Sequence, residues 1–173
     1  NLPINKMKKN YAWLLESFAM IPNIIKMVSD NISYVENNYE LIFTHDKRLL
    51  PLSNKFRLIL PNAVPWVMNR GIHKKSKLIS MIASHKTGCP GHIYRQEVLK
   101  KHKNKMDCFG TGRNFINKKE EGLNNYYFSI GMQNDNYPNY FTEELTDCFA
   151  TGTIPIFWGT SRIGEFLSEK GII

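Results

Sequence analysis

The stretch NDNYPNYFTEELTDCFATGTIPIFWGT, residues 134–160, decides which fold is expected for this chain. Within it, FTEELTDCFATG predicts a helix closed by Gly152, and IPIFWG predicts a strand. YYFSIGMQ, just upstream, predicts another strand. A strand, a polar loop, a helix and a strand indicate a parallel βαβ unit, whose ligands bind outside the carboxyl ends of the strands.

The first turn of the predicted helix carries Thr142, Glu143 and Glu144. Residues of these types cap helix N-termini and complement the helix dipole. They also suit a ligand-binding role, because this turn lies at the carboxyl end of a predicted strand. The residues alone leave both interpretations open.

The composition is that of a globular protein with phosphate-bearing partners. Of 173 residues, 42% are hydrophobic and 22% charged, which is enough to build a core. The net charge of +8 favours a nucleic acid or a nucleotide sugar as partner. Cys89, Cys108 and Cys148 are far apart and form no CxxC pair, so neither a disulfide framework nor a metal site is expected. A reducing, cytoplasmic compartment is the simple interpretation.

The two ends suggest a fragment of a longer protein. The chain begins at Asn1 without an initiator Met and stops at the apolar run GII. No run approaches the roughly 18 apolar residues that span a membrane, and no signal segment is present. An upstream signal or anchor and a peripheral membrane location stay open. A partial lobe would expose apolar surface, which favours a homo-oligomer.

The rest of the chain continues the alternation of strands and helices. Strands are predicted in AWLLES (12–17), ELIFTHD (40–46), FRLILP (56–61), KLISMIAS (77–84) and MDCFG (106–110). The second and third are near-continuous apolar runs, as expected of strands buried on both faces. The fold class is therefore α/β with a largely parallel sheet.

Two further helices are predicted, and one basic stretch separates two lobes. The helix over 21–35 carries a stripe of Ile and Val, and on the helix within 88–105 the residues Ile93, Val98 and Leu99 face one way. IHKKSK then marks the crossing between a lobe at 1–72 and a lobe at 73–173.

The deciding stretch resembles a known family signature. FSIGMQNDNYPNYFTEEL (128–145), followed by GTIPIFWG (152–159), resembles that of glycosyltransferase family 10, the α1,3/4-fucosyltransferases. That signature has Glu-Asn-Ser/Thr after an apolar strand, then Tyr-x-Thr-Glu-Lys, then Val/Ile-Pro-Val/Ile and Gly. SHKTGCPGHIYRQEVLKK (84–101) resembles the family's strand, Ser-containing loop and helix with a phosphate-binding Arg. WLLES, followed by Pro22, is similar to its Phe-Glu-Ser-Pro loop.

The resemblance implies two Rossmann-like lobes of the GT-B type, the N-terminal one incomplete. It implies transfer with inversion from a nucleotide-diphosphate sugar, GDP-fucose above all, to a glycan hydroxyl, with no metal and no obligate cofactor. The implied catalytic base is Glu16. The implied donor-binding residues are Lys86, Arg95, Arg113, Asn134, Tyr140, Thr142 and Glu143. His45 and Asp46 are placed near the acceptor. Without the resemblance, Arg95 is a solvated helix charge and Glu16 a surface residue.

Two positions depart from the signature. Gln133 stands where the family has Glu, and Glu144 where it has a phosphate-binding Lys, which reverses a charge beside the diphosphate. Lys86, Arg113 or another cation compensates, or the donor differs, or the chain is weak or inactive. The alternative is a non-catalytic nucleotide-sugar or glycan-binding remnant. A nucleic-acid-binding domain based on the lysines of 100–105 is not favoured, because aromatic residues are not interleaved with them.

Overall fold

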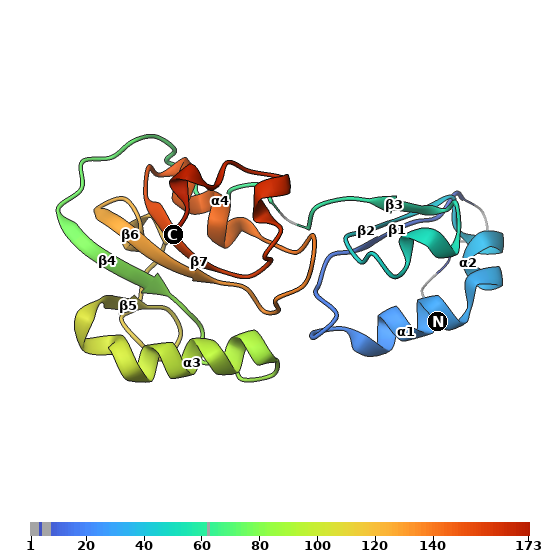
Figure 1. Cartoon of the computed structure of the whole chain (residues 1–173), viewed down its shortest axis with the longest axis horizontal. Coiled ribbons are helices and arrows are strands. Elements are labelled where there is room, and N and C mark those ends of the chain that lie inside the picture. Colours follow the sequence, from blue (N-terminus) through green and yellow to red (C-terminus); the bar gives the residue numbers. More distant parts are fainter. Residues whose placement is uncertain (1–3, 5–7, 62) are drawn as a thin grey trace.

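The computed structural model describes residue 4, residues 8–61 and residues 63–173. These residues form two parallel β-sheets, one from the first third of the chain and one from the remainder (Figure 1). Every strand pair in both sheets is parallel. The predicted α/β class with largely parallel strands is therefore confirmed.

The first sheet has three strands in the order β1-β2-β3. Its elements are β1 (Tyr11–Leu14), α1 (Pro22–Asp30), α2 (Ile32–Asn38), β2 (Leu41–Thr44), the 3-10 helix η1 (Leu50–Leu52) and β3 (Phe56–Leu58). Pro22 begins α1, where a missing backbone N–H costs nothing. The helix predicted over 21–35 is divided at Asn31, and the two helices pack on the sheet through Ile25 and Val28 of α1 and Val35 of α2.

Only one face of this sheet is covered by described helices. Ile42 and Phe56 lie in the core beneath α1 and α2. On the other face, Tyr11 and Trp13 of β1 are 57% and 48% exposed, and Arg57 of β3 is exposed as well. The prediction that these strands are buried on both faces is therefore wrong, because the described helices of this part all pack on one side.

The second sheet has four strands in the order β5-β4-β6-β7. Its strands are β4 (Lys77–Ile82), β5 (Asp107–Phe109), β6 (Tyr126–Met132) and β7 (Ile154–Trp158). The helices are α3 (Pro90–His102), α4 (Glu143–Ala150) and the 3-10 turns η2 (Lys103–Lys105), η3 (Lys119–Gly122), η4 (Ile163–Glu165) and η5 (Glu169–Gly171). Gly152 closes α4 with φ +65°, as predicted.

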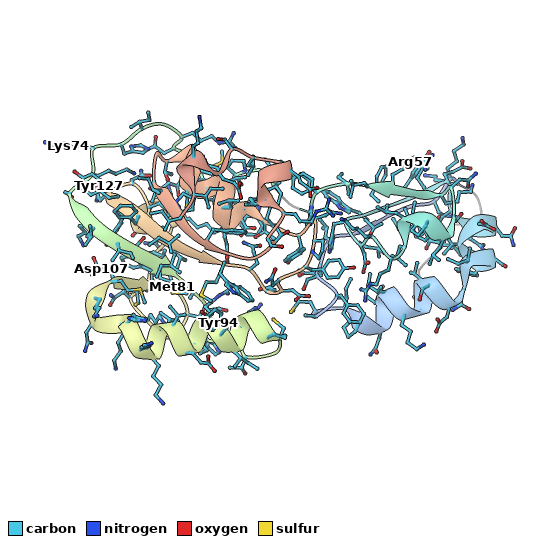
Figure 2. The ribbon with its side chains drawn as sticks, viewed as in Figure 1. Arg57, Lys74, Met81, Tyr94, Asp107 and Tyr127 are labelled. Atoms are coloured by element: carbon cyan, nitrogen blue, oxygen red, sulfur yellow. The ribbon has the colours of Figure 1, made fainter. Side chains whose placement is uncertain are left out.

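Helices cover both faces of this second sheet (Figure 1). Met81 of β4 is fully buried between the sheet and α3, where it packs against Leu99 (Figure 2). Its neighbour Ile82 points to the opposite face and packs in a cluster that includes Cys148 of α4. This alternation along β4 is the pattern of a strand buried on both sides.

Helix α3 buries only part of the face that its apolar residues predict, because Val98 and Leu99 pack in the core and Ile93 does not. Ile93 is 50% exposed, whereas His92, Arg95 and Leu99 are buried. The reason is a backbone contact at the start of the helix, where Gly91 donates to the carbonyl of Asn134 at 3.0 Å. That contact turns the polar residues of the first two turns inward, and the prediction for Ile93 is wrong.

The connector between the sheets lies against the second sheet. Asp147 of α4 accepts the backbone N–H groups of Trp66 and Val67 at 2.6 and 3.0 Å. Glu120 accepts those of the next two residues. The lobe boundary between residues 72 and 73 stays a prediction. Throughout the described part of the chain, no helix has the length and apolarity that crossing a membrane requires.

Candidate functional site

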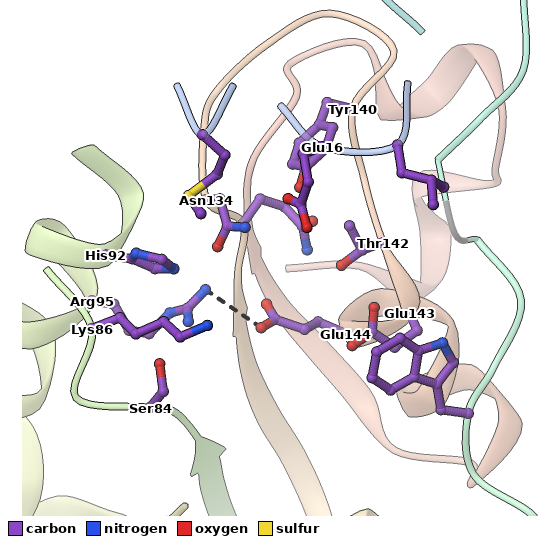
Figure 3. Close-up of a pocket in the computed structure, with 14 residues that line it drawn as sticks. Glu16, Ser84, Lys86, His92, Arg95, Asn134, Tyr140, Thr142, Glu143 and Glu144 are labelled. Atoms are coloured by element: carbon purple, nitrogen blue, oxygen red, sulfur yellow. Dashed lines mark ion pairs between the residues drawn. The ribbon is translucent and has the colours of Figure 1, made fainter. Parts of the chain in front are cut away.

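A cavity of about 300 Å³ lies between the two sheets at the carboxyl ends of their strands (Figure 3). Loops after β1, β4 and β6 and the first turns of α3 and α4 supply its lining. A second cavity of about 380 Å³ adjoins it and extends over β4 and β6 towards Gly110 and Lys119. Both cavities are lined by Lys86, Arg95 and Glu144, which therefore lie where the two meet.

The structure brings together all but one of the residues that the resemblance assigned to catalysis or donor binding. The first cavity is lined by Glu16, Lys86, Arg95, Asn134, Tyr140, Thr142 and Glu143. Arg113 lies outside both cavities, where its guanidinium donates to Gln96 Oε1 at 2.8 Å and to the carbonyl of Ala83 at 3.2 Å. In this position Arg113 holds the start of the β4–α3 loop against α3.

Arg95 is a buried charge, contrary to the interpretation of a solvated helix residue. Its side chain is 6% exposed and forms an ion pair with Glu144 Oε1 at 3.4 Å (Figure 3). The guanidinium also donates to the carbonyl of Met132 at the end of β6. Arg95 therefore reaches across the ends of the central strands and places its charge in both cavities.

Glu144 opposes that charge only in part. Burial raises the pKa of its carboxyl to about 7, against the lowering effect of Arg95 and with a further rise from Glu143. No described residue hydrogen-bonds its Oε2 atom. The raised pKa favours the neutral form of Glu144, which leaves the charge of Arg95 less neutralised than an ordinary carboxylate would.

Lys119 is a further cation at the site, and the sequence reasoning missed it. Its ammonium lies 2.7 Å from Glu143 Oε1 and 2.9 Å from Asp147 Oδ2, with the Trp66 ring centroid at 4.6 Å. Burial lowers the pKa of Lys119, but the two carboxylates outweigh burial and raise it. The partners are 24 and 28 positions away in the chain, so no local signal could have revealed the contact.

The first turn of α4 is better explained as a cavity wall than as a cap. Thr142 occupies the N-cap position but forms no side-chain capping hydrogen bond to the described residues. Glu143 and Glu144 bind Lys119 and Arg95 instead. All three side chains line the cavity, as Figure 3 shows.

Lys86 and Glu16 reach the cavity from loops of the two different sheets. Lys86 extends from the β4–α3 loop toward Glu144, and its ammonium forms no ion pair with a described residue (Figure 3). Glu16 follows β1 and lies beside Tyr140. Burial, and then the charges of Glu16 and Glu144, raise the pKa of the Tyr140 hydroxyl, which stays protonated and can donate.

His45 and Asp46 join the two halves of the molecule and do not line the first cavity. Asp46 binds Arg48 and accepts the Tyr137 hydroxyl at 2.9 Å, so it ties the loop after β2 to the loop after β6. His45 is buried, and burial lowers its pKa to about 4. Asn139 donates to the His45 carbonyl at 3.4 Å. These contacts fix the walls of the cleft.

The described residues contain no group of three or more His, Cys, Asp or Glu side chains arranged to hold a metal ion. All three cysteines are free thiols. The site consists of cations, carboxylates and neutral hydrogen-bonding groups, which together suit a polar ligand with negative charge.

The chain is similar in sequence to known fucosyltransferases. Residues 72–173 match the family described as glycosyltransferase family 10 (fucosyltransferase) C-term. Over 58 residues the chain is 29% identical to an alpha-(1,3)-fucosyltransferase of Helicobacter pylori, a match that covers 34% of this chain and 12% of that protein.

Two solved structures share the fold. A crystal structure of an alpha1,3-fucosyltransferase superposes with a TM-score of 0.56 at 18% identity and covers 79% of this chain. A second crystal structure, of an alpha1,3-fucosyltransferase with GDP-fucose, superposes with a TM-score of 0.58 at 16% identity and covers 92% of this chain. The match spans 51% and 55% of their lengths. The likeness confirms the GT-B-type fold class. The family match extends over more than half of the residues of this chain. The chain therefore belongs to glycosyltransferase family 10.

Proposed function

We propose that this chain takes part in an inverting glycosyl transfer from a nucleotide-diphosphate sugar, with GDP-fucose as the favoured donor, to a hydroxyl of a glycan acceptor. One observation carries the proposal: the carboxylate of Glu16, from the first sheet, and the cation of Arg95, from the second, line one cavity. GDP-fucose in one solved structure of the same fold supports the choice of donor.

In the proposed reaction the two sheets supply opposite ends of one displacement. Glu16 accepts the proton of the acceptor hydroxyl, while the oxygen of that hydroxyl forms a bond to the anomeric carbon of the donor sugar. The bond from that carbon to the diphosphate breaks on the opposite side, so the configuration inverts, and the electron pair leaves with the diphosphate. Arg95 and Lys86 stabilise the negative charge that develops on this leaving group.

The two cavities suggest how the donor lies. The diphosphate lies at Arg95, which lines both cavities. The sugar occupies the first cavity, on the side of Glu16, and the nucleoside occupies the second, against Gly110 and Thr111. Lys119, in the second cavity, holds Glu143 at the position where the signature places a hydroxyl-binding carboxylate.

A Glu16→Gln variant tests the proposal. We expect transfer of fucose from GDP-fucose to an array of glycan acceptors to fall by about 100-fold or more, because the amide cannot accept the proton, while GDP binding by calorimetry stays unchanged. Glu97→Gln is the matched control, since Glu97 is exposed on α3 and lines neither cavity. Unchanged transfer by Glu16→Gln would remove Glu16 as the base.

A non-catalytic binding protein is the second candidate. The ion pair of Arg95 with Glu144 favours it, because an ionised Glu144 opposes the cation intended for the diphosphate. Donor binding by the unaltered chain without any transfer, across the same acceptor array, would select this candidate. Binding of no nucleotide sugar at all would eliminate both.

A further inference from the structure

Gln133 is a buried side chain whose polar groups have no partner in the described part of the protein. It follows β6 directly, is 1% exposed and lines the first cavity. Its backbone N–H donates to Trp158 at 2.9 Å, but neither Oε1 nor Nε2 of the side chain forms a hydrogen bond with a described residue. Buried amides in folded proteins normally bind protein, water or ligand, so this pair of atoms requires an explanation.

The packing around Gln133 fixes where its amide lies. A Cβ atom built on Gly159 would come within 2.7 Å of Gln133 Cγ, so the side chain rests directly on the backbone at the end of β7. On the other side, the carbonyl of Gln133 lies 2.1 Å from a Cβ built on Gly91. Two close backbone contacts therefore hold this residue at the wall of the cavity, which is how a preorganised binding group is built.

A second buried polar atom lies in the same cavity. His92 is 4% exposed, and its Nδ1 atom has no hydrogen-bond partner among the described residues. Burial and then the charge of Arg95 lower the pKa of His92, so the imidazole is neutral at neutral pH. The first cavity is thus lined by two neutral side chains, Gln133 and His92, with polar atoms that have no hydrogen-bond partner among the described residues.

We propose that Gln133 binds hydroxyl groups of the transferred sugar and so helps to select the donor. The inference rests on the proposed function. Gln133 and Glu16 line the first cavity and not the second, whereas Arg95 lines both. With the diphosphate at Arg95, the part of the donor on the Gln133 side is the sugar that reacts next to Glu16.

The chemistry of the amide agrees with that assignment. An amide donates through Nε2 and accepts through Oε1, and a hydroxyl likewise donates and accepts, so the two match in both directions. A diphosphate only accepts, so it would bind Nε2 and leave Oε1 without a donor. The glutamate that the family signature has at this position could only accept when ionised, so glutamine adds a donor to this site.

The test compares two ligands that differ only in the sugar. Calorimetric Kd values for GDP and GDP-fucose are measured with the unaltered chain, with Gln133→Met, which has similar volume and no polar groups, and with Gln133→Glu. We expect Gln133→Met to weaken GDP-fucose binding by about tenfold and to leave GDP binding unchanged. Its thermal midpoint should be equal or higher, because removing an unpaired buried amide does not destabilise the fold. Gln133→Glu should weaken GDP-fucose binding by a smaller factor.

The outcomes separate the inference from the function on which it rests. Three results would overturn the role of Gln133 and leave donor binding by the unaltered chain intact. These are equal weakening of GDP and GDP-fucose binding in Gln133→Met, no change in the binding of either ligand, and loss of folding in both variants. An unaltered chain that binds GDP and GDP-fucose equally would overturn it as well. An unaltered chain that binds neither ligand would overturn the proposed function together with this inference.

Discussion

Replacing Lys119 with Met should destabilise the protein, because it leaves two carboxylates without their shared cation. Lys119 lies 2.7 Å from Glu143 and 2.9 Å from Asp147, whose side chains are 12% and 2% exposed. Met keeps most of the aliphatic stem, so the change removes the charge and little packing. The loss of stability measures how much Lys119 offsets the repulsion and burial of Glu143 and Asp147 in the wall of the second cavity.

The magnitude follows from the burial of the three groups. Removing one member of a buried ion pair typically costs about 3–5 kcal/mol. Asp147 retains its two backbone donors, Trp66 and Val67, and Lys119 is 27% exposed, so the lower end, about 3 kcal/mol, is expected. For a chain of 173 residues this corresponds to about 9 °C in Tm.

The assay is urea unfolding of Lys119→Met at neutral pH, with Lys101→Met as control. Lys101 is exposed on α3, and no ion pair joins it to the described residues. Since the folded pKa of Lys119 is raised above 10.5, the stabilisation is complete well below that pH and is lost as the pH rises through the folded pKa. A Lys119→Met variant within about 0.5 kcal/mol of the control would refute the reasoning.

Two further predictions concern the neighbouring elements. Glu144, with a pKa raised from 4.5 to about 7, stabilises the fold below pH 4.5, and this contribution is lost as the pH rises through about 7. Over that upper range ionised Glu144 neutralises Arg95, so GDP-fucose affinity should fall about threefold to tenfold from pH 6 to pH 8, whereas Glu144→Gln should give a flatter profile. Gly91→Ala should lower the free energy of unfolding by about 3 kcal/mol, because its Cβ would lie 2.1 Å from the Gln133 carbonyl oxygen, and Gly88→Ala should be nearly neutral because nothing lies within 4 Å.

Each of these predictions has a result that contradicts it. The same pH profile in the unaltered chain and in Glu144→Gln would show that another group controls donor affinity. Equal stabilities of Gly91→Ala and Gly88→Ala in urea unfolding would show that α3 can move away from the loop after β6. Calorimetry at a series of pH values measures the donor affinity, and urea unfolding measures the stability of the glycine variants.

Local sequence patterns predicted most of the strands and helices of the fold. The strand over 126–133, the helix ended by Gly152 and the strand behind it occur in the structure as predicted. These elements depend on turn residues, helix ends and runs of apolar side chains, which neighbouring residues determine. The parallel pairing also followed, because alternating strands and helices allow few other arrangements.

Burial was predicted less well, because it depends on what packs against each element. Ile93 looks like a core residue in the sequence but is exposed, since Gly91 fixes the rotation of α3 against the loop after β6. The strands predicted over 40–46 and 56–61 look buried on both faces, yet described helices cover only one. Neither fact is present in the local pattern of the chain.

By itself, the sequence determined the α/β class, the order of most elements and, through the family resemblance, most of the residues that gather at the carboxyl ends of the strands. Only the tertiary structure decided how those residues are paired. It placed Arg113 outside the cavity, joined Lys119 to Glu143, set Glu144 against Arg95 and left the amide of Gln133 unpaired. The physical reason is that charge pairing and desolvation act over a few ångströms in space between residues far apart in the chain, and local sequence does not record those distances.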